Sequence, residues 1–294
     1  MADAGRRLSD NAAGDFFVDD TCIDCGTCRR VAPDSFAEGR GGSRVHRQPD
    51  SAGPVERARM ALVACPVAAI GTEVKHDLKA ARRAFPERLE DEVYFCGWAS
   101  PRSYGAASYL IRRPAGNVLV DSPRFARPLV ERLEALGGVS LMVLSHIDDV
   151  ADHEAFAAHF GCARITHRAD AQGALAGAER LVDGSAPVTL ADDLTLIPVP
   201  GHTAGSVCLL YRDRFLFTGD HLAWDTDRRR LEAWRDYCWF DWTAQTASMR
   251  RLLGRRFEWV LPGHGDAVSL PATTMRAALA DCVRRMEGPA RRAG

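Results

Sequence analysis

Residues 144–153 read LSHIDDVADH and follow a short apolar run that is typical of a buried strand. His146, Asp148 and the pair Asp152-His153 are of residue types that ligate metal ions, because imidazole suits zinc, copper and iron and carboxylates suit harder cations. Apolar residues after the pair recur at helical spacing. The stretch therefore predicts a metal-binding turn between a strand and a helix.

Three later motifs place a polar residue at the end of an apolar strand. VPGHTAGS presents His202 just after a strand, FLFTGDHL presents Asp220, and WVLPGHGD presents His264. Residues at such strand ends project into a shared cleft at the edge of a sheet. All three are candidate metal ligands, and a role as ordinary turn residues is the alternative.

These four motifs together resemble the metallo-β-lactamase fold superfamily in their order and approximate spacing, over about residues 93–285. The resemblance implies an αββα sandwich and a dinuclear metal site in which Asp220 bridges the ions. Carried over by position, the implied ligands are His146, Asp148, Asp152, His153, His202, Asp220 and His264. We expect Asp220 and Asp152 to take part in catalysis.

The match to the family pattern, H-x-H-x-D-H, breaks at its second histidine. Asp148 stands two residues after His146, and two extra residues, Val150 and Ala151, precede the D-H pair. Three alternatives are open: Asp148 fills the vacant position, Asp149 fills it, or no residue fills it and the first metal is weak or absent. The spacing from His146 favours Asp148. Aspartate is also a favoured helix N-cap, which is the preferred interpretation of Asp149.

A cysteine cluster lies near the amino terminus. CIDCGTC places Cys22, Cys25 and Cys28 at C-x-x-C-x-x-C spacing, and CPVAAI supplies Cys65 before a proline. Three thiolates on one tight loop with a distant fourth suit an iron–sulfur cubane. The alternative is a structural zinc site with four cysteine ligands.

This cluster resembles that of bacterial ferredoxins, over roughly residues 15–75. In two-cluster ferredoxins a further cysteine precedes a proline three residues after the third and serves the other cluster. Here that slot reads Ala32-Pro33. The resemblance therefore implies a single [4Fe-4S] cluster held by Cys22, Cys25, Cys28 and Cys65.

Length and motif placement predict two domains of α+β class. We expect a disordered stretch at 1–14, a ferredoxin-like domain at 15–75, a linker at 76–92 and a metallo-β-lactamase-like domain at 93–294. A net charge of −1 gives no reason to expect nucleic acid or membrane as a partner. We expect a cytoplasmic protein with a small-molecule substrate, an electron-donor protein or reductase as a further partner, and a possible oligomer.

A histidine followed two residues later by a carboxylate resembles the diiron sites of flavodiiron proteins, although no flavodoxin-like domain follows here. This favours iron over zinc for the two metal ions. An attached iron–sulfur domain favours it further, because hydrolysis needs no electrons. We therefore expect a redox enzyme whose cluster supplies electrons to a diiron site that activates oxygen or another small oxidant.

Two other functions stay open. One is a glyoxalase- or lactonase-like zinc hydrolase, in which two metals polarise a carbonyl and generate hydroxide while the cluster is structural or regulatory. The other is an electron-transfer or sensor protein with a degenerate metal site.

Four of the six tryptophans lie in the stretch 221–242. This stretch could line an apolar pocket over the metals, with Arg235 anchoring a carboxylate. A packed cover over the sheet is the alternative. Ser103 and Tyr104 lie in a second candidate lining near the start of the larger domain.

Overall fold

The computed structural model describes residues 2–288 and divides the chain into two compact units. The first unit comprises Met1–Met142 and Asp149–Ala163, and the second comprises Val143–Asp148 and Arg164–Gly294. The stretch 144–153 thus holds one of the points where the chain passes between units. Among the described residues, no helix is both long enough and apolar enough to span a bilayer.

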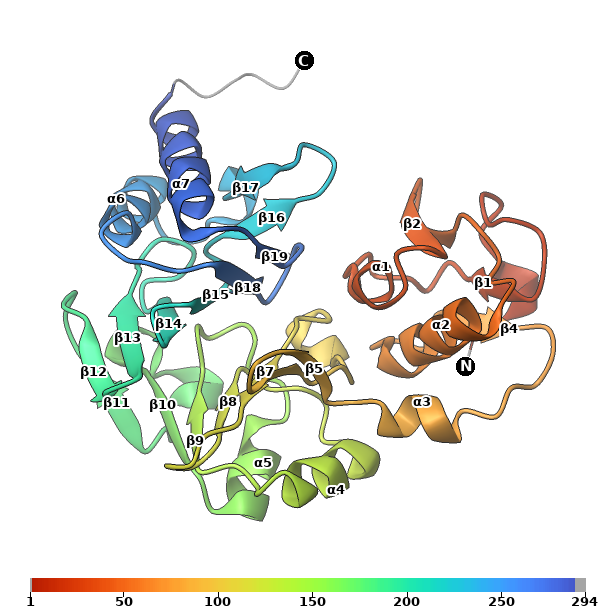
Figure 1. Cartoon of the computed structure of the whole chain (residues 1–294), viewed down its shortest axis with the longest axis horizontal. Coiled ribbons are helices and arrows are strands. Elements are labelled where there is room, and N and C mark those ends of the chain that lie inside the picture. The colour runs from red at the N-terminus through yellow and green to blue at the C-terminus, as the bar shows by residue number, and fades with distance from the viewer. Residues whose placement is uncertain (1, 289–294) are drawn as a thin grey trace. The chain divides into compact units, whose positions relative to one another are not determined.

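The amino-terminal part of the first unit is built on two small antiparallel sheets and two helices (Figure 1). Helix α2 forms where apolar residues recur at helical spacing, and Cys65 is its C-cap. Its buried face carries Ala58, Ala61 and Ala64, whose small side chains permit close packing. The elements are η1 (Ala4–Arg6), β1 (Phe16–Val18), α1 (Thr27–Val31), β2 (Phe36–Gly39), β3 (Gly42–Val45), α2 (Ala52–Ala64) and β4 (Ile70–Thr72).

The predicted disorder at 1–14 is not what the structure shows for residues 2–14. The Leu8 amide donates to the Val18 carbonyl, and Asn11 bonds the backbone of both Leu8 and Val18. Arg7 forms an ion pair with Glu73. A polar segment is ordered here because its backbone and side chains pair with β1 and its surroundings.

The rest of the first unit holds an antiparallel run of strands, β5-β6-β7-β8, three α-helices, and strand β9, whose last residue belongs to the second unit. Helix α4 buries Leu129, Val130 and Leu133 on one face, which is the amphipathic pattern expected of a helix covering a sheet. The elements are α3 (Lys79–Arg83), β5 (Glu87–Glu90), β6 (Val93–Phe95), η2 (Pro101–Ser103), β7 (Tyr109–Ile111), β8 (Val118–Val120), α4 (Arg127–Ala135), β9 (Leu141–Val143) and α5 (His153–Phe160).

The stretch 76–92, predicted as a linker, contains α3 and the sheet strand β5. Strand β5 reads ERLE and is the last strand of its sheet. Charged side chains are typical of edge strands, where they prevent pairing with another chain. The strand therefore lacks the apolar pattern by which strands are recognised.

The second unit contains a six-stranded sheet of order β12-β13-β14-β15-β18-β19. Strands β14 and β15 are buried at every position, so their sequences are continuous apolar runs. Helices α6 and α7 lie side by side (Figure 1), and Met249, Leu279, Leu216 and Val260 join them and the sheet in one core.

The remaining elements belong to the second unit, except that the first residue of β10 belongs to the first unit. They are β10 (Ala163–His167), η3 (Arg168–Asp170), η4 (Gly173–Leu175), β11 (Arg180–Val182), β12 (Val188–Ala191), β13 (Leu194–Pro198), β14 (Val207–Tyr211), β15 (Phe215–Gly219), β16 (Ala223–Asp225), β17 (Arg230–Glu232), η5 (Arg235–Tyr237), α6 (Trp242–Leu252), β18 (Trp259–Pro262), β19 (Val268–Ser269) and α7 (Ala272–Glu287).

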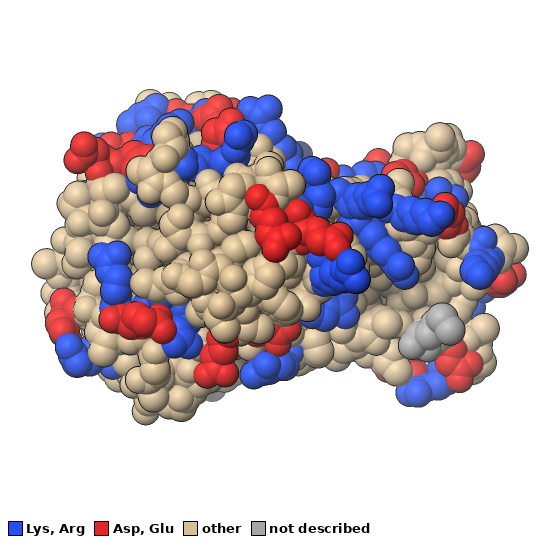
Figure 2. Space-filling view, turned by 90° about the horizontal axis from the view of Figure 1, so that it is seen from below, with Lys and Arg blue, Asp and Glu red and all other residues tan. Residues whose placement is uncertain are grey.

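The charged surface is mixed in sign. Figure 2 shows acidic and basic side chains lying next to one another at many places on the face that it draws. This agrees with the net charge of −1 and with the many exposed ion pairs, such as Arg168 with Asp183.

Candidate metal centres

The four predicted cluster ligands line one cavity in the first unit, together with Val18, Ile23, Thr27, Ser43, Pro66, Val67, Ala69 and Ile70. Cys22 and Cys25 lie on the loop before α1, Cys28 lies within α1, and Cys65 caps α2. Cys28 and Cys65 are buried, whereas Cys22 and Cys25 are partly exposed. The fold thus brings together the thiols that the spacing predicted.

Backbone amides point at the cysteine sulfurs of this cavity. The Ser43 amide lies 3.4 Å from Cys22 Sγ, and the Ala69 amide lies 3.3 Å from Cys65 Sγ. Such N–H···S contacts stabilise charge on a cluster and set its potential. Burial raises the pKa of Cys28 to about 12, so this thiol becomes a thiolate only with a bound cation. The donor set and its surroundings fit a [4Fe-4S] cluster.

Two glycines permit the backbone to approach the cysteines closely. A Cβ on Gly42, which has a φ of +125°, would lie 2.8 Å from Cys22 Sγ. A Cβ on Gly105, with a φ of +85°, would lie 2.4 Å from Cys25 Cβ. The Gly105 carbonyl also accepts a hydrogen bond from Thr27 Oγ1 at 3.1 Å. The loop 100–108, which carries Ser103 and Tyr104, therefore packs against the cysteine loop.

A polar network borders the same cavity. Arg29 donates to Ser43 Oγ at 2.8 Å and to Asp24 Oδ1 at 2.6 Å. Because the Ser43 hydroxyl accepts from Arg29, its own proton is free to point at the Cys28 sulfur, and this contact opposes the rise of the Cys28 pKa that burial causes. Sequence spacing gave no signal for this role of Ser43.

The second unit brings together five of the predicted ligands of the dinuclear site. His146 follows β9, His202 follows β13, Asp220 follows β15, and His264 follows β18. His146, Asp148 and His202 each offer a ligand atom within 4.8 Å of the others. The rings of His146 and His202 lie edge to face at 4.7 Å.

The distances between these ligand atoms suit a bound cation. His202 Nε2 lies 3.4 Å from Asp148 Oδ2 and 3.9 Å from Asp220 Oδ2, and His146 Nε2 lies 3.7 Å from Asp220 Oδ2. Two ligands about 2.1 Å from one tetrahedral ion are roughly 3.4 Å apart. His202 Nε2 is buried and makes no hydrogen bond to any residue in the range 2–288. These residues fit a metal ion.

The outward nitrogen of each buried imidazole is held by a neighbour. His202 Nδ1 bonds the Tyr237 carbonyl at 2.5 Å, which requires a proton on Nδ1 and leaves Nε2 as the ligand atom. His146 Nδ1 lies 2.9 Å from Ser145 Oγ. Gly219, with a φ of +50°, leaves room for Ser145, because a Cβ there would lie 2.4 Å from its hydroxyl.

The electrostatics of the site keep its carboxylates ionised. Burial raises the pKa of Asp220, but the Coulombic attraction of His264 and the hydrogen bond between these two side chains, together with the charge of His202, outweigh burial and hold that pKa well below its usual range. His202 lowers the pKa of Asp148. Burial lowers the pKa of His146 to about 4, so this imidazole is neutral near pH 7 and able to ligate.

His264 lies at the site but contacts Asp220 directly. Its Nδ1 is 2.8 Å from Asp220 Oδ2, and its amide donates to Asp220 Oδ1 at 3.0 Å. A metal ion held by both residues would replace the ring contact and leave the backbone hydrogen bond in place.

Asp152 and His153 belong to the first unit. Asp152 precedes α5 but its side chain makes no capping bond. Its carboxylate accepts instead from the Phe125 amide at 2.8 Å and pairs with Arg102 at 3.0 Å. His153 opens α5 and is buried, as is Asp149. Ligation by Asp152 and His153 stays a prediction.

Asp170 is a site residue that the sequence analysis missed. Its Oδ2 accepts from the Ile147 amide at 3.1 Å and from Thr203 Oγ1 at 2.6 Å, and its Oδ1 accepts from the Gly205 amide at 2.8 Å. One buried carboxylate thus ties the His146 turn to the His202 turn. Only its position after strand β10 could have drawn attention to it.

A model of one protein family matches residues 18–72, and that family is the 4Fe-4S single cluster domain of ferredoxin I. The match agrees with the predicted ferredoxin-like domain and its single cluster. No curated protein is similar enough in sequence to the chain to give a match.

Several solved structures that are similar to the chain are metallo-β-lactamases. The FIM-1 enzyme from Pseudomonas aeruginosa in its mono-zinc form has a TM-score of 0.52 at 14% identity, covering 69% of this chain and 95% of that one. DIM-1 exposed to ceftazidime has a TM-score of 0.52 at 17% identity, covering 68% and 95%. The B3 enzyme BLEG-1 has a TM-score of 0.51 at 19% identity, covering 67% and 100%.

These likenesses show the fold. The chain combines a single-cluster ferredoxin-like domain with the sandwich of sheets and helices found in the metallo-β-lactamase superfamily, as the motifs predicted.

Proposed function

We propose that this protein is a redox enzyme in which a [4Fe-4S] cluster supplies electrons to a dinuclear metal site, with iron favoured over zinc, that activates oxygen or another small oxidant. When bound, the metals supply the site for that oxidant, and the cluster supplies single electrons. We place the protein in the cytoplasm with a small-molecule substrate and an electron-donor protein or reductase.

The observation that carries the proposal is the position of Asp148. Its carboxylate lies beside His202 Nε2 and within ligand range of His146, at the place where the family pattern has a histidine. A carboxylate in place of imidazole makes the donor set harder and more negative, which favours iron in higher oxidation states over hydrolytic zinc. The cysteine cavity supports the same function, because a [4Fe-4S] cluster bound there would supply electrons.

The protein's own residues would act by positioning and by charge. Asp220, kept ionised, would be a carboxylate ligand of the metal site, and His146 and His202 would each offer Nε2 while Ser145 and the Tyr237 carbonyl fix their rings. Asp152 is proposed as the second catalytic carboxylate. Burial of both imidazoles excludes water from this side of the site.

A zinc-dependent hydrolase, glyoxalase- or lactonase-like, is the second candidate. FIM-1, which shares the fold, is described in a mono-zinc form. In this case the metals would polarise a carbonyl, and the cluster would have a structural or regulatory role.

Metal and sulfide analysis of protein purified without air, with electron paramagnetic resonance before and after reduction, separates these functions. About six irons and about four sulfides per chain are expected for a cubane plus a diiron site. About four irons with roughly two zincs would overturn the redox proposal in favour of the hydrolase. Retention of the cluster alone would instead indicate an electron-transfer or sensor protein.

A further inference from the structure

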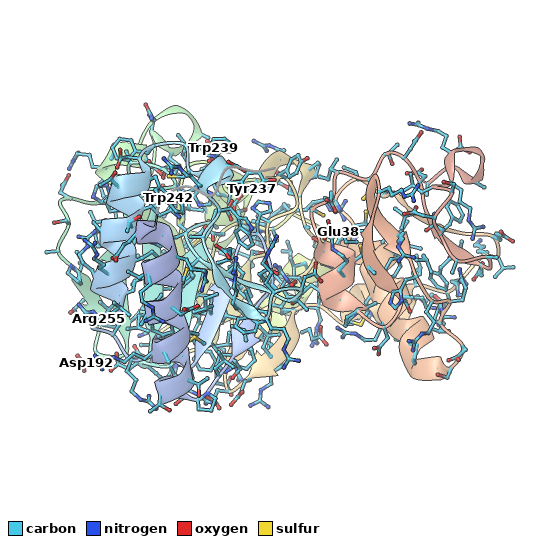
Figure 3. The ribbon with its side chains drawn as sticks, turned by 90° about the horizontal axis from the view of Figure 1, so that it is seen from above. Glu38, Asp192, Tyr237, Trp239, Trp242 and Arg255 are labelled. Atoms are coloured by element: carbon cyan, nitrogen blue, oxygen red, sulfur yellow. The ribbon has the colours of Figure 1, made fainter. Side chains whose placement is uncertain are left out.

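Three exposed aromatic side chains gather in one short stretch of the second unit. Tyr237, Trp239 and Phe240 are 62%, 64% and 56% exposed, and together they are called the aromatic segment below. Figure 3 labels Tyr237 and Trp239, and their rings meet edge to face at 6.2 Å. Large apolar side chains this exposed are costly to leave in water unless something binds them.

The neighbouring tryptophans behave differently. Trp224 and Trp242 are partly buried and pack against the core of the second unit. They form the packed cover that was one interpretation of the stretch 221–242. The aromatic segment lies outside this core, so packing of the described core does not explain it.

The aromatic segment is held rigidly to a candidate metal ligand. The amides of Trp239 and Phe240 both donate to the His202 carbonyl at 3.0 Å, and the Tyr237 carbonyl bonds His202 Nδ1. Next to them, Cys238 Sγ lies 3.1 Å from the Gly201 carbonyl. These bonds fix the backbone of the segment while leaving its rings in solvent.

The rings also lie close to the place where a metal would bind. The Trp239 ring centroid is 6.1 Å from that of His202, whose Nε2 faces Asp148 and Asp220. A molecule that stacks on the Trp239 ring would therefore extend to the candidate metal ligands His202, Asp148 and Asp220.

We propose that the aromatic segment is the binding site for a flat, apolar, preferably aromatic, group of an organic substrate whose oxygen donor reaches the metal centre. This inference rests on the proposed metal site and names the substrate class for it. Aromatic rings prefer offset or edge-to-face contact with other rings, which an exposed Trp–Tyr pair offers from two directions.

The size of the segment favours a small molecule over a second copy of the chain. Aromatic side chains present roughly 150–250 Å² each, so three that are a little over half exposed offer roughly 300–400 Å². A standard protein interface buries about 800 Å² per partner. The segment is thus too small for a stable dimer and large enough for one bicyclic ligand.

The test uses 2-naphthoate and acetate as probes, which share the carboxylate and differ in the flat apolar group. Their dissociation constants for the metal-loaded full chain are measured by calorimetry. We expect Trp239→Ala to weaken 2-naphthoate binding about tenfold and to leave acetate binding unchanged. Tyr237→Ala should weaken 2-naphthoate binding to a smaller extent. Val74→Ala is the control, because Val74 is an exposed apolar side chain (60%) that belongs to neither candidate site.

The proposal is overturned if Trp239→Ala leaves 2-naphthoate binding within twofold of the parent, or if Val74→Ala weakens it as much as Tyr237→Ala. It is also overturned if 2-naphthoate fails to bind while Trp239→Ala changes the sedimentation coefficient, which would mean self-association. Circular dichroism checks that each variant is folded.

Repeating the titration on protein stripped of its second-unit metals separates this inference from the proposed function. Binding of 2-naphthoate that depends on Trp239 but not on metal would support the aromatic site even if no redox activity exists. Metal binding and oxidant consumption without 2-naphthoate binding would uphold the function and remove the aromatic site.

Discussion

The cysteine cavity and the histidine–aspartate site are assembled in opposite ways. Three of the four cysteines lie within seven residues, and the fourth caps the helix that packs on them. The other site takes its ligands from turns scattered from His146 to His264, and Asp170, which is not a ligand, joins two of those turns. Spacing within one loop is enough to bring most of the cysteines together. The histidine–aspartate site depends in addition on a buried side chain, Asp170, that joins the turns carrying its ligands.

The largest expected effect comes from removing Cys65. In Cys65→Ala the cluster loses the one ligand outside the local loop, so we expect iron and sulfide to fall from about four each to near zero. Metal bound in the second unit should remain. Iron and sulfide analysis measures this, with Cys282→Ala, a buried thiol in the second unit, as the control. A cluster retained at full occupancy would remove Cys65 from the ligand set.

The histidine–aspartate site should lose metal affinity when Asp170, which is not itself a proposed ligand, is replaced. Asp170→Asn removes the charge that holds the Ile147, Thr203 and Gly205 donors, so both turns lose their common anchor. We expect metal affinity in the second unit to fall about 10- to 100-fold, with the cluster unaffected. Asp183→Asn, at an exposed ion pair, is the control. Equal metal affinity in the two variants would contradict the anchoring role.

A smaller effect on metal occupancy is expected at the position where the family pattern has its second histidine. If Asp148 is a ligand, Asp148→Ala should lower metal occupancy more than Asp149→Ala, because Asp148 lies 3.4 Å from His202 Nε2. Metal content after dialysis against a weak chelator measures the order. The reverse order would assign the position to Asp149.

Metal binding should also depend on pH through His202. Burial lowers the pKa of His202, but the Asp148 and Asp220 carboxylates outweigh it and raise that pKa above its ordinary 6.5. A metal must displace this proton, so affinity should be level above the raised pKa and fall up to tenfold per pH unit below it. His146, with a pKa of about 4, is already deprotonated near pH 6, so it does not contribute to the pH dependence of metal affinity there. Titration calorimetry in buffers of different ionisation enthalpy counts the protons, and none released near pH 6 would refute the prediction.

The smallest effect is expected at the cluster's border. Ser43→Ala removes a hydroxyl beside Cys28 that Arg29 orients, and the reduced, more negative cluster loses most from this. One hydrogen bond is worth about 1 kcal/mol, which lowers a one-electron potential by about 40 mV. Potentiometric titration followed by electron paramagnetic resonance measures the shift. Ser51→Ala, at an exposed serine before α2, should leave the potential unchanged.

The features that could be predicted from the sequence are those indicated by the spacing of the cysteines and by polar residues at the ends of apolar strands. The gathering of Cys22, Cys25, Cys28 and Cys65 and the sandwich of sheets and helices could be predicted, because motifs of a few neighbouring residues indicate them. Asp170 could not, because its partners are Ile147, Thr203 and Gly205, which are distant in sequence. Strand β5 and the ordered residues 2–14 were missed because charged, polar segments gain their order from tertiary pairing.

The order of ligands along the chain has a consequence for assembly in the cell. All four cysteines leave the ribosome before His146, and His264 follows Cys65 by about 200 residues. At about 5–20 residues per second, the cysteine cavity is complete some 10–40 s before the last imidazole is made. Iron–sulfur insertion can therefore begin on the nascent chain, whereas the histidine–aspartate site can be completed only after His264 has been made.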